Sequence, residues 1–243
     1  MNALQNLVEY YEELFPIEEN QKHFFTELFS AYTGPIHFLG VSCGTGNLEH
    51  YLAKQGIDVT GIDIEKEFIE YANRKRRTQL MSLRYFQMSG LEMSKYLQKG
   101  FFNVISSLNN KLIFIYDKLL IQKFLAACKS LLVQNGTLVL QIPNFDFYNG
   151  YSEFSFPERE SIRSRMYIDI HVNERDEAFL TEVIETGNER ILPVFKDKRI
   201  YPLMPAELRQ IAREAGFIKL DLYADYNFSP VTEETEELIC VLS

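Results

Sequence analysis

The stretch formed by residues 36–63 constrains the fold of this chain more than any other segment. Residues 36–41 are a short, mostly apolar run with the pattern of a buried strand. Residues 42–46 form a glycine-rich turn, and residues 47–55 then carry apolar side chains at helical spacing. Residues 58–62 are a second apolar run, directly followed by Asp63. The order strand, glycine turn, helix, strand and acid predicts a βαβ unit that binds a nucleotide at the turn.

The spacing of the glycines indicates which nucleotide this unit binds. The dinucleotide fingerprint G-x-G-x-x-G, started at Gly44 and Gly46, would require glycine where Glu49 stands. Glu49 would also place a negative charge beside a pyrophosphate at the start of the helix. No G-x-x-x-x-G-K-[ST] segment is present either. A reductase that binds NAD is therefore disfavoured.

The glycine turn resembles motif I of the class I S-adenosylmethionine-dependent methyltransferases, whose pattern is roughly L-D-x-G-C-G-T-G. The matching residues are Leu39, Cys43, Gly44, Thr45 and Gly46. The chain departs from the pattern at Gly40, where the family has an acid, and at Ser42, where it has the first glycine. In the family the acid helps to hold the amino-acid end of the ligand. The resemblance thus implies that binding is weakened or that another residue has taken over this role, and a turn that binds nothing is the bland alternative.

Alternating strand and helix patterns continue beyond this unit and predict an α/β fold. Helices are predicted at residues 65–77, 117–132 and 205–215, and strands at 82–88, 103–108, 137–142, 218–223 and 237–242. We expect a doubly wound, mostly parallel sheet of seven strands with right-handed crossovers. The resemblance, which covers nearly the whole chain, implies that the last strand is antiparallel.

Two further regions are predicted outside this sheet. Residues 1–34 contain two amphipathic helices, which the resemblance implies are a lid. Residues 146–200 begin with a loop at 148–157 and continue with period-two runs at 165–173, 179–186 and 190–200. These runs predict an inserted antiparallel sheet of three strands. This arrangement resembles glycine/sarcosine and sugar-amine N-methyltransferases, and the resemblance implies that the sheet covers the substrate. The cofactor-binding domain would then comprise residues 35–145 and 201–243.

The resemblance implies that the cofactor is S-adenosylmethionine and the product S-adenosylhomocysteine. Parallel strands bind ligands at their carboxyl ends, so the predicted contacts follow four neighbouring strands. The predicted cofactor-binding residues are Gly40, Ser42, Cys43, Gly44, Gly46, Asp63, Ile64, Ser89, Gly90, Leu91, Leu108 and Asn109. Asp63 would accept hydrogen bonds from the ribose hydroxyls. Ser89 stands where the family often has an acid that contacts the adenine amino group.

Methyl transfer needs the acceptor to lie in line with a sulfonium methyl group, and orientation alone can supply about 7–11 kcal/mol. No catalytic base is identified from the sequence. Candidate substrate contacts are Tyr11 on the first helix, Tyr148 in an aromatic loop, and Arg165 and Arg199 on the inserted sheet. For the tyrosines the alternative is packing, and for the arginines it is a solvated strand surface.

The charge, the cysteine content and the apolar runs of the chain limit the kinds of binding partner that are expected. A net charge of −9 and a pI near 5.1 disfavour nucleic acid, which requires clustered cations. The run Arg74–Lys75–Arg76–Arg77 is interpreted as a solvated helix end, with an RNA-contacting patch as the alternative. Three widely spaced cysteines predict neither a disulfide framework nor a metal site. Without an apolar run of about 18 residues or a leader, we expect a cytoplasmic protein with no membrane partner.

Two functions are consistent with these features. The first is an active methyltransferase for a small-molecule acceptor, because the [DNS]-P-P-[YF] segment of DNA methyltransferases is replaced by Ile142-Pro143-Asn144-Phe145. The second is a non-catalytic or regulatory protein that binds S-adenosylmethionine or S-adenosylhomocysteine, in which Gly40, Ser42 and Ser89 mark relaxed constraints. The sequence leaves the acceptor and the oligomeric state open.

Overall fold

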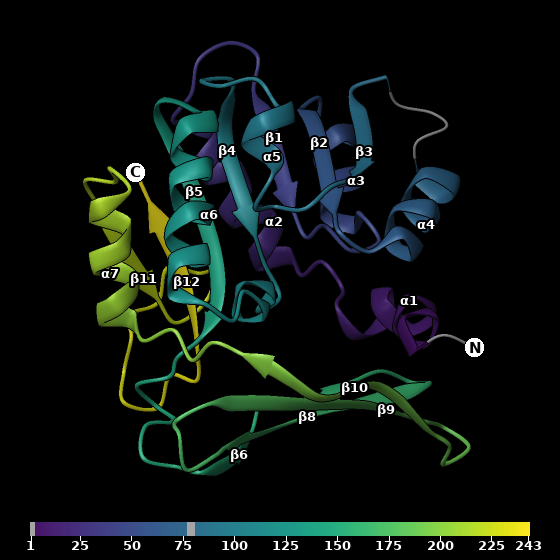
Figure 1. Ribbon diagram of the computed structural model, residues 1–243. Helices are drawn as coiled ribbons and strands as arrows, with labels where there is room; N and C mark the ends of the chain where they lie inside the picture. Colours follow the sequence, from purple (N-terminus) through teal and green to yellow (C-terminus); the bar gives the residue numbers. More distant parts are fainter. Residues whose placement is uncertain (1–2, 77–80) are drawn as a thin grey trace.

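The computed structural model describes residues 3–76 and 81–243 and contains two sheets, one above the other in Figure 1. The larger sheet has seven strands in the order β11-β12-β5-β4-β1-β2-β3. Its strands are β1 (His37–Val41), β2 (Asp58–Asp63), β3 (Leu83–Gln87), β4 (Phe102–Ser107), β5 (Leu132–Pro143), β11 (Leu220–Tyr223) and β12 (Glu237–Leu242). β12 is antiparallel to both of its neighbours, whereas β1 to β5 are mutually parallel. The predicted fold class is confirmed.

Helices cover both faces of this sheet (Figure 1). On one face lie α2 (Glu19–Ser30), α3 (Asn47–Lys54) and α4 (Lys66–Arg76), and on the other α5 (Met93–Tyr96), α6 (Lys118–Leu131) and α7 (Pro205–Glu214). The start of α6 is fixed by Asp117, whose carboxylate accepts hydrogen bonds from the amides of Leu119 and Leu120. Burial of the apolar stripes of these helices against the sheet forms the two main core clusters.

The inserted sheet has five strands, not the predicted three. They are β6 (Glu153–Ser155), β7 (Arg159–Glu160), β8 (Ser164–Val172), β9 (Ala178–Thr186) and β10 (Ile191–Ile200). The predicted meander corresponds to β8, β9 and β10, and a short turn between the predicted runs 179–186 and 190–200 joins the last two. The prediction of a loop at residues 148–157 is wrong in part, because these residues contain β6, which pairs with β8. Strands of two or three residues are too short to show a period of two in the sequence.

Two local differences also concern the main sheet. β5 begins five residues before the predicted strand at 137–142, and within this extension Asn135 has a left-handed φ of 60° and the register with β4 shifts. The short helices α5 and η2 (Lys111–Phe114) were not predicted. Each has only four residues, which is too few to display helical periodicity.

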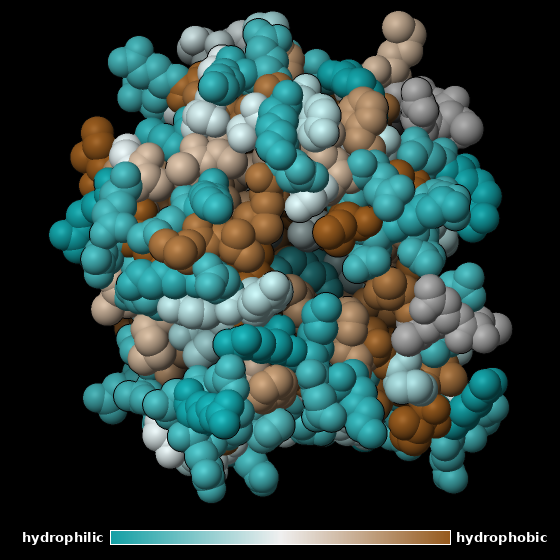
Figure 2. All heavy atoms as spheres, in the orientation of Figure 1, coloured by the Kyte–Doolittle hydropathy of each residue, from teal (hydrophilic) through white to brown (hydrophobic). Residues whose placement is uncertain are grey.

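Helix α1 (Ala3–Leu14) lies between the main domain and the inserted sheet (Figure 1). Its buried residues Leu7, Tyr11 and Leu14 share one core cluster with Phe68 of α4 and Met166 of β8. The helix therefore packs against both parts of the molecule. The face shown in Figure 2 is largely hydrophilic, with smaller hydrophobic groups across its middle. No helix in the described part of the chain is long and apolar enough to cross a membrane.

Candidate functional site

The glycine turn between β1 and α3 has an unusual backbone. Ser42, Gly44 and Gly46 have φ values of 56°, 56° and 72°, in the left-handed region. A Cβ on Gly44 would lie 2.7 Å from the ring of Tyr11, and one on Gly46 would lie 2.4 Å from the ring of Tyr85. Both positions therefore require glycine for conformation and for space. Ser42 adopts the same conformation at a strain cost, which is typical of functional turns.

Asp63 ties this turn to the end of β2. Its Oδ2 accepts a hydrogen bond from the amide of Gly44 at 2.9 Å, and its Oδ1 accepts one from the amide of Glu65 at 3.0 Å. The side chain is buried, and burial raises the pKa of the carboxyl, while the backbone hydrogen bonds oppose the shift. The carboxyl ends of β1 and β2 are thus joined by an acceptor group that retains free lone pairs.

Glu49 lies in the first turn of α3 and points back toward β1. The residue is only 3% exposed, and its Oε1 would lie 1.9 Å from a Cβ on Gly40. Burial raises the pKa of this carboxyl to about 7. The helix N-terminus favours the charged form, since it carries a partial positive charge. Glu49 was not predicted as a site residue.

Tyr11 and Asn109 close the site from two different elements. Tyr11 comes from α1 and is buried, which raises the pKa of its hydroxyl. Asn109 follows β4, and its Nδ2 donates a hydrogen bond to Tyr11 Oη at 3.3 Å. Asn109 and Asn110 have consecutive left-handed φ values of 54° and 60°. This backbone turns the Asn109 side chain toward α1 and the glycine turn.

A small cavity of about 40 Å³ lies between these groups. It is lined by Tyr11, Phe15, Pro16, Ile17, Gln21, Val41, Ser42, Cys43, Asn47, Leu48, Glu49, Ser106, Leu108 and Asn109. In the turn beside it, the buried Oγ1 of Thr45 has no hydrogen-bond partner among the described residues. A second cavity, of about 180 Å³, adjoins the first and shares Phe15, Pro16, Gln21 and Asn109 with it.

The second cavity is lined by a network of polar side chains. Gln141 Oε1 accepts hydrogen bonds from the Asn109 amide at 3.0 Å and from the Tyr226 hydroxyl at 2.9 Å. Gln141 Nε2 donates to Glu237 Oε2 at 2.5 Å, and the guanidinium of Arg159 lies 3.7 Å from Glu237 Oε1. These residues join the ends of β4, β5 and β12 to the inserted sheet.

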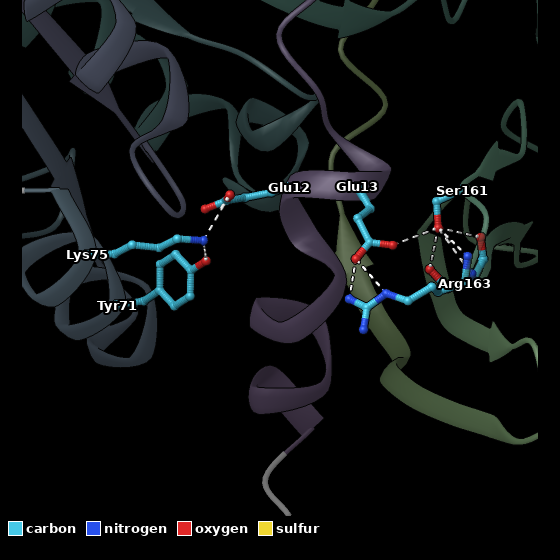
Figure 3. Close-up of polar contacts among 7 residues, drawn as sticks. Glu12, Glu13, Tyr71, Lys75, Ser161 and Arg163 are labelled. Carbon is cyan, nitrogen blue, oxygen red and sulfur yellow. Dashed lines mark hydrogen bonds and ion pairs between the residues drawn. The ribbon is translucent and has the colours of Figure 1, made fainter.

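Ion pairs hold α1 on both sides (Figure 3). On the side of the main domain, Glu12 contacts Lys75 at 3.3 Å and also pairs with Arg76. On the side of the inserted sheet, Glu13 pairs with Arg163 and accepts a hydrogen bond from Ser161 at 3.2 Å. α1 therefore has to break contacts on two sides before it can move away from the glycine turn.

Arg76 corrects the prediction of a solvated helix end. Its side chain is 7% exposed, and its Nε donates a hydrogen bond to the carbonyl of Thr45 at 2.9 Å. Arg76 lies four residues after the buried Ala72 and seven after the buried Ile69, so helical spacing could have identified it. Arg74 and Lys75 are exposed, as predicted, whereas Arg77 lies outside the described residues.

The structure brings together part of the predicted cofactor site. Ser42, Cys43, Leu108, Asn109 and Tyr11 line the small cavity. Gly40 and Gly44 adjoin Glu49 and Tyr11 of its wall, and the amide of Gly46 donates to the carbonyl of Cys43. Asp63 is linked to the site through the amide of Gly44. Ser89, Gly90 and Leu91 follow β3, where a Cβ on Gly90 would lie 2.9 Å from Val41, and Ile64 is 59% exposed beside Asp63. All of these residues lie at the carboxyl edge of the parallel strands.

Three predicted substrate contacts lie elsewhere. Tyr148 is buried under the inserted sheet, stacks on Phe154 at 4.5 Å between ring centres and donates a hydrogen bond to Glu236. Arg165 pairs with Glu160 at 2.7 Å, and Arg199 pairs with Glu177 at 2.9 Å. None of the three lines either of the two cavities at the sheet edge. No cluster of metal-ligating side chains occurs within residues 3–76 and 81–243.

Part of the chain is similar to known methyltransferases in sequence. Residues 38–136 match the family described as "Methyltransferase domain". A curated protein of Geobacillus sp. (strain WCH70), named a "Putative methyltransferase", is 26% identical over 109 residues, which are 45% of this chain and 43% of that protein. The chain therefore spans less than half the length of this relative. Residues 38–136 are thus similar to a methyltransferase domain.

Solved structures extend the likeness in fold to the rest of the chain. An S-adenosylmethionine-dependent methyltransferase from Clostridium acetobutylicum ATCC 824 has a TM-score of 0.77 at 16% identity, covering 100% of this chain and 99% of that one. The sugar N-methyltransferase KedS8 from Streptoalloteichus sp. ATCC 53650 has a TM-score of 0.66 at 13% identity, covering 99% and 93%. The chain thus has the fold of the class I, S-adenosylmethionine-dependent methyltransferases, with the inserted sheet included, which confirms the predicted resemblance.

Proposed function

We propose that this protein is an S-adenosylmethionine-dependent methyltransferase for a small-molecule acceptor. The proposal rests on one observation: the glycine turn, Asp63 and Asn109 meet at the carboxyl edge of the parallel strands, beside two adjoining cavities. Ligands of doubly wound folds bind at this edge, where the strand order reverses. β1 is that point, since β2 and β4 lie on its two sides.

The residues at this edge fit S-adenosylmethionine. Gly44 presents no side chain, so the space beside it is held only by the ring of Tyr11, which α1 can withdraw, and the unpartnered Thr45 hydroxyl offers a hydrogen bond. Asp63 retains free lone pairs for the ribose hydroxyls, and Ile64 is an exposed apolar surface next to it. When bound, the cofactor supplies an activated methyl group, which passes to a nucleophile as the carbon–sulfur bond breaks and its electron pair stays on sulfur.

We propose that α1 is a lid that opens to admit the cofactor. A cavity of about 40 Å³ is far smaller than the roughly 300–1,000 Å³ of small-molecule sites. Tyr11 fills much of the missing space, because its ring packs against Gly44 and its hydroxyl bonds to Asn109. Movement of α1 would withdraw Tyr11, and reclosure would exclude water from the reacting groups.

The second cavity is the proposed acceptor site. Its wall carries the carboxylates of Glu18, Asp225 and Glu237, and Arg159 is its cation. An acidic wall favours a cationic or hydrogen-bonding acceptor, such as a small amine or an amino sugar. The sugar N-methyltransferase that shares this fold supports the same class of acceptor. The role of the chain is then to bind the acceptor amine and to orient its lone pair toward the methyl group.

Calorimetric titration tests the first step of this proposal. The purified protein is titrated in parallel with S-adenosylmethionine, S-adenosylhomocysteine and NAD. We expect micromolar binding of the two sulfur compounds and none of NAD, because Glu49 opposes a pyrophosphate. Transfer of a labelled methyl group to a panel of small amines, amino sugars and hydroxyl compounds then tests catalysis. Absence of binding would overturn the proposal, whereas binding without transfer to any acceptor would favour a non-catalytic binding protein.

A further inference from the structure

Gly40 stands where motif I has an acid, and Glu49 stands where the dinucleotide fingerprint has a glycine. The two residues are neighbours in the structure. A Cβ on Gly40 would lie 1.9 Å from Glu49 Oε1 and 2.8 Å from Glu49 Cδ. The space that a side chain at position 40 would enter is thus filled by the carboxylate of Glu49. Gly40 lies in β1 and its φ is not left-handed, so the backbone does not require glycine there. Glycine at position 40 makes room for the Glu49 carboxylate.

We propose that the Glu49 carboxylate binds the primary ammonium group of the cofactor's amino-acid end, in place of an acid on β1. The inference rests on the proposed function and names the residue that holds this part of the ligand. The acid therefore comes from the first turn of α3 instead of from β1, but its carboxylate lies in the space that a side chain at position 40 would occupy. The sequence shows only that one acid is missing and that another stands nine residues later.

Partners of Glu49 within the protein do not account for its burial. Apart from its own backbone amide, no donor bonds to the carboxylate in residues 3–76 and 81–243, and no ion pair forms there. The nearest cation, Arg76, directs its guanidinium to the Thr45 carbonyl, His50 and Glu12. A buried carboxylate without a cation is costly unless a ligand supplies one.

The other groups that face Glu49 strengthen its preference for a cation. Asp63 of β2 is a second buried acid, while Cys43 of the turn, Tyr85 of β3 and Tyr11 of α1 are neutral hydrogen-bonding groups. The surroundings of Glu49 thus have acidic character. Among the described residues, Arg76 is the cation whose charge acts on Glu49, whereas Lys111 acts on the neighbouring Asp63 and lies over the ring of Tyr11. A primary ammonium supplies three N–H donors, whereas a sulfonium supplies none, so the amino group matches a carboxylate better.

A pair of ligands separates this role from a structural one. S-Adenosylhomocysteine carries the ammonium, whereas 5′-methylthioadenosine has the same nucleoside and thioether without the amino-acid end. We expect Glu49→Gln to weaken S-adenosylhomocysteine binding by roughly 10- to 150-fold, the value of a charge-assisted hydrogen bond. Binding of 5′-methylthioadenosine should change by less than about twofold. Glu70→Gln removes an exposed acid of α4 and is the control for net charge.

Proton release gives a second readout that does not depend on affinity. The pKa of Glu49 is near 7 in the free protein because the carboxyl is buried, and an adjacent ammonium lowers it. Wild type should therefore release a fraction of a proton when S-adenosylhomocysteine binds at pH 6.5. Titrations in buffers of different ionisation enthalpy measure this fraction. Glu49→Gln, or the use of 5′-methylthioadenosine, should abolish the release.

A variant that carries the acid on β1 instead of on α3 tests whether the position of the carboxylate, and not Glu49 itself, is required. Gly40→Asp/Glu49→Ala places a carboxylate on β1 in the space that Glu49 leaves, so it should bind S-adenosylhomocysteine at least tenfold more tightly than Glu49→Ala. Equal loss of affinity for both ligands in Glu49→Gln, or no loss for either, would overturn the inference. If wild type binds neither ligand, the proposed function itself fails. Circular dichroism confirms that each variant is folded before it is titrated.

Discussion

The carboxylate of Asp63 accepts a hydrogen bond from the backbone amide of Gly44 at 2.9 Å, so the end of β2 holds the turn that follows β1. The same side chain has lone pairs left for the ribose of the cofactor. Asp63→Ala should therefore weaken S-adenosylhomocysteine binding by about 1.5–3 kcal/mol, the value of a hydrogen bond to a charged group. Calorimetric titration measures this change, and 5′-methylthioadenosine should lose affinity equally, because both ligands contain the ribose.

Asp58 provides the matched control for this change. It lies at the opposite end of β2 and pairs with His37 and Arg84, away from the glycine turn. Asp58→Ala removes the same side chain from the same strand and should leave both dissociation constants within about twofold of wild type. Unchanged affinity in Asp63→Ala would exclude Asp63 from the site.

Gly44 has two separate reasons to be glycine, and two variants distinguish them. Gly44→Ala introduces a left-handed alanine, which costs about 1 kcal/mol or more, and also a contact with the ring of Tyr11. Gly56 has a φ of 89°, and a Cβ at this position would have no atom within 4 Å, so Gly56→Ala carries the strain alone. Gly44→Ala should lower the melting temperature more than Gly56→Ala does, as measured by circular dichroism.

Removal of the tyrosine ring isolates the contact between the two residues. Gly44→Ala/Tyr11→Ala should destabilise the protein by less than the sum of the two single changes, because the clash occurs only when both side chains are present. Additive effects would show that α1 is not packed on the turn in solution. The comparison requires no ligand, so it tests the closed position of α1 directly.

Many residues at the carboxyl edge of the parallel strands could be predicted from the sequence. Parallel strands that alternate with helices bring the same ends of neighbouring strands together. Asp63 and Asn109 were placed in this way, and they do lie at that edge. Glu49 was missed because its side chain points toward β1 only where the facing strand residue is small, and the sequence does not show which strand residue faces it. Gly40 was interpreted only as the loss of an acid. The partners of Arg165 and Arg199 were missed because Glu160 lies in the two-residue β7 and Glu177 lies just before β9, where no hydrophobic period marks the position.

Opening of α1 should depend on its ion pairs. Glu12→Gln/Glu13→Gln removes the links to Arg76 and Arg163 together. Exposed pairs contribute little, but Arg76 is buried, so we expect amide hydrogens of residues 3–14 to exchange roughly tenfold faster. Hydrogen exchange followed by mass spectrometry measures this rate. S-Adenosylhomocysteine should also associate faster.

A neighbouring acid of α1 controls for the loss of charge. Glu9 is exposed on the same helix and forms no ion pair in the described part of the chain. Glu9→Gln should leave the exchange of residues 3–14 within about twofold of wild type. If Glu12→Gln/Glu13→Gln behaves in the same way, these pairs do not hold the helix closed.

The free energy of unfolding of the ligand-free protein should depend on pH because of Glu49. Its folded-state pKa of about 7 exceeds the 4.5 of an unfolded chain, so the native state binds more protons between these values. The free energy of unfolding contributed by Glu49 is thus fully present below pH 4.5 and is lost as pH rises through 7, by about 3 kcal/mol in total. Glu49→Gln cannot ionise. It should match wild type near pH 5 and exceed its stability at pH 8.5, in urea unfolding followed by circular dichroism.

Saturating S-adenosylhomocysteine should reverse this order. The ligand stabilises the native state of wild type by RT ln(1 + [L]/Kd), and its ammonium compensates the charge of Glu49. Glu49→Gln binds more weakly and gains less, so wild type should become the more stable protein at pH 8.5. Buried acids such as Asp63 and Glu182, whose pKa values are also raised by burial, are common to both proteins and cancel in the comparison. If Glu49→Gln remains more stable than wild type with the ligand present, Glu49 destabilises the native state and does not bind the ligand.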